Sequence, residues 1–440
     1  MKRRDFVKAA LAAPFIGVAG TDGTACSQAV QQFIRDNAPC QGVKHPLTGK
    51  KLPPWKSGEF QVHFIYTGVA ESMFWIMPDG TTMLLDCGDH PAITRGKLAI
   101  WVLPNGKRHS GEWIGRYVLR VNPKGKDVDY LMISHHHADH AGMTGWGAGE
   151  REWNGRKLSV SGVLQAADFL KFKTCFDRGW PNFNDPIPDE RCNELAYRHL
   201  RDVFEYLMER DGLKMEKFTV GAVNQVALKN AAAFPGFSVT NITGNGKIRR
   251  RDGSVRDLYA ERHDAKSLNE NGMSLGLMVR YGPFRFYTAG DFYDVFKLPD
   301  GTKRDLELEL AKEVDPVDVA KINHHGHHSM HLPLVAALRA RVWTACMWDQ
   351  LHVTADTLER LASREAYPDP RLIAPAVFPP ERRFADAGKP FLADIAPESF
   401  NAGHVVLTVA PGGATYSIVY VTADDESMKV TGAYDFTSKG

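Results

Sequence analysis

The segment 133–142, Ile-Ser-His-His-His-Ala-Asp-His-Ala-Gly, holds the residue types with the clearest chemistry in this sequence. The run before the histidines, DVDYLMI, is short and apolar, which is typical of a buried strand. Because residues two apart on an extended chain point the same way, His135 and His137 can bind one ion together. Asp139 and His140 follow where the chain must turn, and they can reach a second ion. Imidazole and carboxylate ligands suit zinc, manganese or iron.

The composition sets broad limits on what this chain can be. It has 440 residues, of which 43% are hydrophobic and 24% charged, as in an ordinary soluble protein with a sizeable core. A net charge of +2 gives no support for binding to nucleic acid or to an anionic membrane. The six cysteines are scattered and form no Cys-x-x-Cys pair, so we do not expect a thiolate zinc site. Disulfides stay open, with Cys175 and Cys192 as one close pair.

Residues 1–25 have the composition of an export signal. Basic residues precede a short run rich in alanine and glycine, too short to span a bilayer with ease. The pattern Arg3-Arg4-x-Phe6-x-Lys8 resembles a twin-arginine signal, which would bring a folded and metal-loaded protein to the twin-arginine export machinery. We therefore expect a periplasmic or secreted protein without a stable membrane span. A frayed basic terminus is the alternative interpretation.

Three strands are predicted before the histidines, at 62–66, 73–77 and 82–85, and the third ends in an Asp-x-Gly motif that begins at Asp86. Strand, turn, strand, Asp-x-Gly and then a histidine cluster is the order in which the metallo-β-lactamase superfamily opens, and the chain resembles that superfamily. The segment 67–72 is similar to the Gly-Gln-Gly-Asp-Ser segment of one branch. That branch contains the hydrolase domain of competence DNA-uptake channels and the phosphorylcholine esterases.

The resemblance implies a fold and a division of the chain. The fold is an α/β sandwich of four layers, αβ/βα, in which two β-sheets face each other with helices outside. We expect this domain over 60–425, with a helical insertion at about 144–266. The insertion contains no metal-binding motif, and we expect it to build the substrate cleft. A linker over 26–59 would precede the domain, and a tail over 426–440 would follow it.

The resemblance also implies roles for residues outside the histidine cluster. Asp86 matches a residue that orients the metal-binding histidines, which need such partners to fix their ring angle. Asp291, in a Gly-Asp pair at the end of a predicted strand, matches the carboxylate that bridges both ions. In the His-His-Gly segment that begins at His324, the match assigns His325 to the second ion and His324 to the substrate. The reverse assignment of these two histidines stays open.

One departure from the superfamily concerns the first ion. Many members have a third histidine just before the strand pair that leads to Asp291, and this sequence has Asn271 there. The branch with the similar opening segment also shows Asn-x-x-Ser at this point. With one nitrogen ligand fewer, the first site should bind zinc less tightly and accept manganese more readily. Asn271, Ser329 and His352 are the candidate substrate contacts.

These residues predict a metal-dependent hydrolase. Two divalent ions, zinc first and manganese as the alternative, would lower the pKa of water to about 7. Asp139 would orient that nucleophile, and His324 would donate a proton to the leaving group or bind a phosphoryl oxygen. The branch resemblance favours a phosphodiester substrate, in a small molecule or in nucleic acid. The alternatives are a β-lactamase or lactonase, a degenerate metal-binding module without turnover, and a chance run of histidines in a polar loop.

Overall fold

The computed structural model describes residues 45–68, 70–89, 102–143, 145, 147–187, 195–262, 268–346 and 352–440. The predicted export signal and most of the predicted linker lie outside these ranges. In the part of the chain that is described, no helix combines the length and the apolar character that a membrane span requires.

The first β-sheet joins the two ends of the described chain. Its strand order is β21-β20-β19-β1-β2-β3-β4-β7-β8. Strands from β21 to β3 pair antiparallel, whereas β3, β4, β7 and β8 run parallel. The strands are β1 (Phe60–Phe64), β2 (Met73–Ile76), β3 (Thr82–Leu85), β4 (Asp127–Met132), β7 (Lys171–Asp177), β8 (Lys214–Lys217), β19 (Gly403–Val409), β20 (Thr415–Thr422) and β21 (Val430–Thr437). The strands expected before the histidines are present, within two residues of their predicted ends.

The second β-sheet comes from the middle of the chain. Its order is β11-β10-β9-β12-β13-β16-β17-β18, antiparallel up to β13 and parallel from there. The strands are β9 (Phe237–Gly244), β10 (Lys247–Arg249), β11 (Val255–Asp257), β12 (Gly276–Tyr281), β13 (Phe284–Thr288), β16 (Val319–Lys321), β17 (Val342–Ala345) and β18 (Leu372–Pro375).

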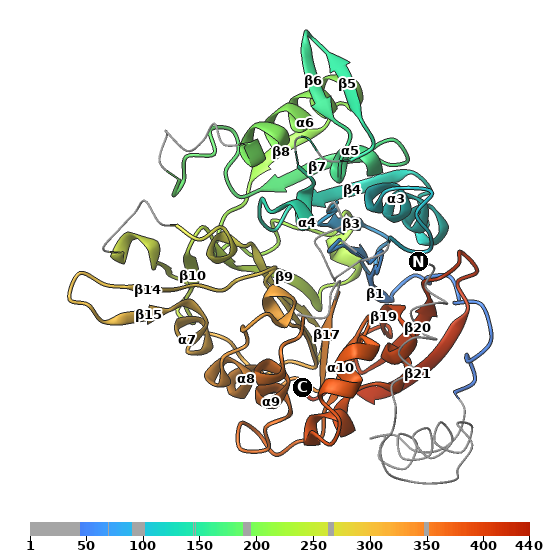
Figure 1. Ribbon diagram of the computed structural model, residues 1–440, viewed down its shortest axis with the longest axis vertical. Coiled ribbons are helices and arrows are strands. Elements are labelled where there is room, and N and C mark those ends of the chain that lie inside the picture. Colours follow the sequence, from blue (N-terminus) through green and yellow to red (C-terminus); the bar gives the residue numbers. More distant parts are fainter. Residues whose placement is uncertain are drawn as a thin grey trace, which may run out of the picture.

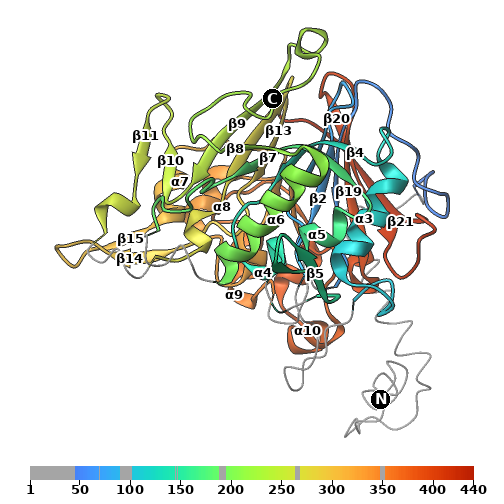
Figure 2. The same cartoon turned by 90° about the horizontal axis from the view of Figure 1, so that it is seen from above.

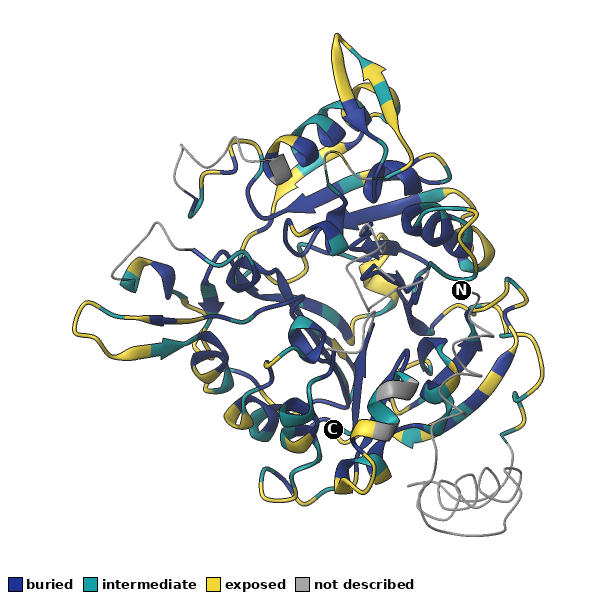
Figure 3. Cartoon of the chain, in the orientation of Figure 1, coloured by how far each residue is buried: buried dark blue, intermediate teal, exposed yellow. Residues whose placement is uncertain are grey.

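Aromatic side chains join the inner faces of the two sheets. The rings of Phe60 and Phe237 lie 5.3 Å apart between centroids, and Phe286 contacts both Phe64 and Trp75 at 6.2 and 5.6 Å. Phe60, Phe64, Trp75 and Phe286 are 0% exposed. The buried strands therefore form the centre of the molecule, and exposed residues gather on helices, hairpins and loops (Figure 3).

Helices cover the outer faces, because each parallel strand pair needs a crossover connection. Figures 1 and 2 show one group of helices beside the first sheet and another beside the second. The first group is α3 (Ser110–Val121), α4 (Ala138–Ala141), α5 (Val163–Ala166) and α6 (Leu195–Asp211); the second is α7 (Leu306–Ala311), α8 (Leu332–Leu338), α9 (Ala355–Ala362) and α10 (Pro380–Ala385). Two hairpins stand apart from the sheets, β5 (Glu150–Trp153) with β6 (Arg156–Ser159) and β14 (Val295–Lys297) with β15 (Lys303–Asp305). The expected four-layer αβ/βα architecture is confirmed.

The division of the chain differs from the prediction in two places. The segment 144–266 is not a helical insertion beside the sandwich, because its strands extend the first sheet by two and the second by three. The segment 426–440 is not a free tail, since β21 completes the edge of the first sheet. Cys175 is a free, buried thiol, and Cys192 lies outside the described residues, so the question of a disulfide between them stays open.

The contact between the sheets predicts a large stability loss when Phe286 is truncated. We expect Phe286→Ala to lower the free energy of unfolding by about 3–5 kcal/mol, because the cavity between Phe64 and Trp75 cannot close. Chemical denaturation of the metal-free protein measures the change. Val295→Ala, at a side chain that is 40% exposed, is the control and should change it by less than about 0.5 kcal/mol. Equal effects of both variants would contradict this account of the core.

Candidate metal centre

Four side chains from three distant segments meet at one edge of the sandwich. Asp139 and His140 lie on the short helix α4, which follows β4. Asp291 follows β13, and His325 lies in a 3-10 turn (Asn323–Gly326) after β16. One ligand atom from each side chain lies within 4.8 Å of the others. The segment 133–142, the Gly-Asp pair and the His-His-Gly segment of the sequence are therefore brought together by the ends of strands from both sheets.

The spacing of these four atoms fits one metal ion. Nε2 of His325 lies 3.1 Å from Oδ2 of Asp139 and 3.3 Å from Oδ2 of Asp291. Nε2 of His140 lies 3.2 Å from the same Asp291 oxygen, 3.3 Å from Nε2 of His325 and 3.6 Å from Oδ2 of Asp139. Ligands at about 2.0–2.1 Å from a tetrahedral ion are about 3.3–3.4 Å apart. The donor set and its geometry therefore suit a divalent ion of the zinc type.

A second group of candidate ligands adjoins this cluster. Nε2 of His135 lies 3.0 Å from Nδ1 of His137 and 3.8 Å from Oδ2 of Asp291. The same Asp291 oxygen thus borders both groups, as the bridging role requires. His135 is fully buried, whereas His137 is exposed. The first metal position therefore opens toward solvent, and the second is enclosed.

Buried acceptors hold the rings of the histidines in place. Nδ1 of His140 lies 2.8 Å from Oδ2 of Asp86, which also accepts from the hydroxyl of Ser134 at 2.6 Å. Nδ1 of His325 lies 3.0 Å from Oε2 of Glu71 and 3.2 Å from the carbonyl of Cys346. A proton on Nδ1 leaves the lone pair of Nε2 free for a metal. Asp86 is thus placed where the predicted orienting role requires it.

The protonation of the clustered side chains depends mainly on the opposite charges of their neighbours in the cluster. Burial alone would raise the pKa of the Asp291 carboxyl, but the adjacent His140 and His325 lower it well below its usual range. Burial would lower the pKa of both histidines, yet Asp291 and Asp139 raise them well above the usual value. Without an ion, protons on the two rings balance the two carboxylates. A divalent cation can take over that positive charge.

The structure separates the two adjacent histidines of the His-His-Gly segment. His325 joins the cluster, whereas the ring of His324 stacks on Tyr293 at 5.9 Å and 19°. Nδ2 of Asn271 lies 3.1 Å from Nε2 of His324, and burial lowers the pKa of this histidine to about 4. His324 and His325 have φ angles of 46° and 50°, in the left-handed region. The backbone therefore turns at each of them, which sends the two rings to different partners.

The three tentative substrate contacts have different outcomes. Asn271 borders His324, and its Oδ1 is buried with no hydrogen-bond partner among the described residues. His352 is buried and stacks on His325, 4.8 Å between centroids and 17° between planes. Ser329 is wrong as a substrate contact, because its buried hydroxyl donates to the carbonyl of Asn323 at 2.6 Å and closes the loop that carries the histidines.

A second group of residues holds the histidine segment in place and was not predicted from the sequence. His136 points away from its neighbours, as alternation along an extended chain requires, and its Nε2 lies 2.8 Å from Asp177. Its backbone N–H donates to Glu270 at 2.9 Å, and the Glu270 carboxylate accepts from Nε and Nη2 of Arg178 at 2.9 and 2.8 Å. Burial opposes ionisation of Glu270, but Arg178 lowers its pKa overall. The sequence signal that could have pointed to Glu270 is its position directly before the candidate residue Asn271.

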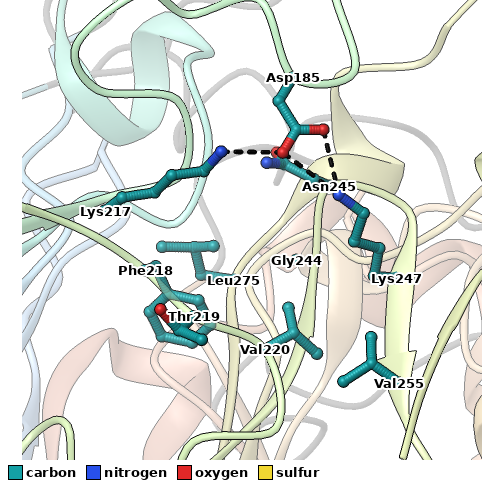
Figure 4. Close-up of a pocket in the computed structure, with 10 residues that line it drawn as sticks. All are labelled: Asp185, Lys217, Phe218, Thr219, Val220, Gly244, Asn245, Lys247, Val255 and Leu275. Carbon is teal, nitrogen blue, oxygen red and sulfur yellow. Dashed lines mark hydrogen bonds and ion pairs between the residues drawn. The ribbon is translucent and has the colours of Figure 1, made fainter.

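Figure 4 shows a cavity that is separate from this cluster. Its volume is about 330 Å³, and none of its lining residues is among the candidate ligands. Asp185 lies between two lysines there, 2.9 Å from Nζ of Lys217 and 3.1 Å from Nζ of Lys247. Phe218 and Leu275 form part of an apolar wall. Because the charges are already paired within the chain, we assign no role to this cavity.

Comparison with known proteins agrees with the site. Residues 66–152 match the model of the metallo-β-lactamase superfamily. No curated protein matches the chain. Among solved structures, the chain is similar to CmlA, a diiron beta-hydroxylase from Streptomyces venezuelae, with 12% identity and a TM-score of 0.32. The match covers 72% of this chain and 49% of that one, so the chain spans about half its length, and a similarity this weak carries no argument.

The family match includes the elements that carry four of the six candidate metal ligands. Residues 66–152 contain Asp86 and the whole histidine cluster of β4 and α4. Asp291 and His325 lie beyond the match, and the structure brings them to the cluster. Residues 66–152 are therefore similar to the metallo-β-lactamase superfamily, and Asp291 and His325 complete the candidate site from outside that match.

Proposed function

We propose that the chain is a metal-dependent hydrolase that uses two divalent ions to activate water, with a phosphodiester as substrate. The observation that supports this most is the cluster of Asp139, His140, Asp291 and His325, whose ligand atoms have the spacing of a tetrahedral site. His135 and His137 adjoin it and share the Asp291 oxygen. Nitrogen and carboxylate ligands suit zinc, manganese or iron, and the superfamily resemblance favours zinc.

The residues around the cluster have separate tasks in this proposal. Bound divalent ions supply a hydroxide at neutral pH and positive charge for the developing negative charge. Asp139, whose side chain is 13% exposed, can accept a hydrogen bond from the attacking water and so orient it. Because Asn271 donates to Nε2 of His324, the neutral ring carries its proton on Nδ1. His324 would then donate a hydrogen bond to a phosphoryl oxygen and would not act as an acid.

Two arguments support a phosphodiester as the substrate. Two ions that share one carboxylate can stabilise both the attacking and the leaving oxygen of an in-line displacement. The segments 67–72 and 271–274 resemble the branch with phosphodiester-cleaving members, and the structure brings both segments to the cluster. Glu71 contacts His325, and the hydroxyl of Ser274 accepts a hydrogen bond from the backbone N–H of Asp291 at 3.1 Å.

Substrate preference tests this proposal directly. We expect the metal-loaded protein to hydrolyse bis(p-nitrophenyl) phosphate faster than nitrocefin or a simple lactone, and the chelated protein to hydrolyse none of them. A preference for nitrocefin or the lactone would overturn the phosphodiester assignment and favour a β-lactamase or lactonase. Absence of any turnover by protein that holds two ions would favour a metal-binding module.

Removal of the shared carboxylate tests the two-ion site. Asp291→Ala should lose one or both ions and reduce turnover to background, because Oδ2 of Asp291 borders the nitrogens of both metal positions. Metal analysis after gel filtration gives the number of ions per chain. Asp300→Ala, the same change at a solvent-exposed aspartate of the β14–β15 hairpin, is the matched control and should keep both. Two ions in Asp291→Ala would contradict the bridging role.

Metal affinity should rise with pH. The raised pKa of His140 and His325 means that both rings hold protons in the metal-free protein at neutral pH, and a metal must displace them. These protons stabilise the metal-free fold below the ordinary histidine pKa, and the contribution is lost as pH rises through the raised values. Zinc titrations between about pH 6 and 8 should therefore show increasing affinity and up to about two protons released per enclosed ion. A pH-independent affinity would contradict this protonation.

A further inference from the structure

We propose that Lys321 and Glu71 form a positioning pair for the enclosed metal position, in which Lys321 holds Glu71 against His325 and faces the outer oxygen of Asp291. This inference rests on the proposed function, since it assumes that the cluster binds a metal. Neither residue is a ligand in the proposed site, and neither was predicted from the sequence to act in it.

Lys321 is the last residue of β16 and is completely buried. Its Nζ lies 3.1 Å from Oε1 of Glu71 and donates to the carbonyls of Gly290 and Ile322 at 2.9 and 3.2 Å. It also lies 3.9 Å from Oδ1 of Asp291. That oxygen is buried and has no hydrogen-bond partner in the part of the chain that the structure describes. The ammonium is thus the cation that faces the carboxylate oxygen turned away from the cluster.

Glu71 connects the same pair to two further ligands. Its Oε2 lies 3.0 Å from Nδ1 of His325, and its backbone N–H donates to the carbonyl of Asp139 at 2.8 Å. Lys321 donates to Gly290, the residue before Asp291. Three of the four clustered ligands are therefore held directly or through a neighbour by one buried ion pair. The fourth, His140, is held by Asp86.

Burial of the charged side chains of Lys321 and Glu71 costs free energy, and a role in orienting metal ligands would explain why they are buried. The neighbours of Lys321 in the chain, Ala320 and Ile322, are 0% exposed, so an apolar side chain would fit the pattern of the strand. A buried ion pair is weak evidence for stability, because desolvation offsets much of the attraction between the charges. A residue that breaks the local pattern points to a functional constraint. Here the constraint is the fixed orientation of His325 and Asp291.

Three variants test the proposal: Lys321→Met, Glu71→Gln and the double variant. Each single change should weaken binding of the enclosed ion about 10- to 100-fold, the usual effect of losing a partner behind a ligand. Because Lys321 acts partly through Glu71 and partly on Asp291 directly, the double variant should lose less affinity than the product of the two single losses. The measurements are zinc competition with a chelator and the ligand-field spectrum of the cobalt-loaded protein, which reports ligand geometry and which a merely structural ion pair would not change.

Lys124→Met is the matched control. Lys124 pairs with the buried carboxylate of Asp129 at 2.6 Å, at the end of β4 opposite to the cluster. Six strand residues at about 3.3 Å each separate that end from the histidines. The control should lower thermal stability only, with an unchanged cobalt spectrum and unchanged zinc affinity.

The outcomes separate this inference from the function on which it rests. If the natural protein binds two ions and the variants keep its affinity and cobalt spectrum, the pair is only structural and the inference is overturned. If Lys321→Met does not fold, the zinc affinity and cobalt spectrum of Glu71→Gln give the same test, because this change keeps the shape of the side chain. If the natural protein binds no metal, the proposed function fails and the inference fails with it. Metal binding without ester turnover would leave the test of Lys321 intact.

Discussion

Two carboxylates and two imidazoles share a space in which their nearest atoms are 3.1–3.6 Å apart. Bringing such groups out of water is unfavourable unless a cation or protons balance the charge. The edge of the sandwich is built around this requirement. Each clustered imidazole has an acceptor behind it, Asp86 for His140 and Glu71 for His325, so that the outer nitrogen faces the shared space. The fold thus brings the four side chains to one place with their outer nitrogens and carboxylates facing each other.

The local part of this arrangement was predictable, and the distant part was not. The spacing of His135 to His140 lies within a few residues, where strand alternation and one turn fix the geometry. Asp291 and His325 are more than 150 residues away, and no pattern in their own segments shows that they meet Asp139. They were placed only through the resemblance to a known family. The order of strands in the two sheets, which makes the meeting happen, cannot be read from any one segment.

The errors have physical reasons as well. Ser329 is a candidate substrate contact only through its resemblance to the serine that follows the His-His-Gly segment of the family. In this tight loop its hydroxyl instead satisfies a backbone carbonyl. Residues 144–266 were interpreted as an insertion because they contain no metal motif. Strand β7 alternates polar and apolar residues only in its first half, so the sequence does not clearly indicate a strand of the sheet there. Glu71 and Lys321 stand in apolar surroundings 250 positions apart, and nothing local pairs them.

The charges around the site argue for two ions. Six buried or nearly buried carboxylates contact a candidate ligand or the segment that carries it: Asp86, Asp139, Asp177, Asp291, Glu71 and Glu270. Two fixed cations accompany them, Lys321 behind the enclosed position and Arg178 behind the open one. With all six carboxylates ionised and the histidines neutral, six negative and two positive charges leave four negative charges, the number that the two divalent ions of the proposed site would balance. In that proposed site, each metal position would have one ion pair behind it.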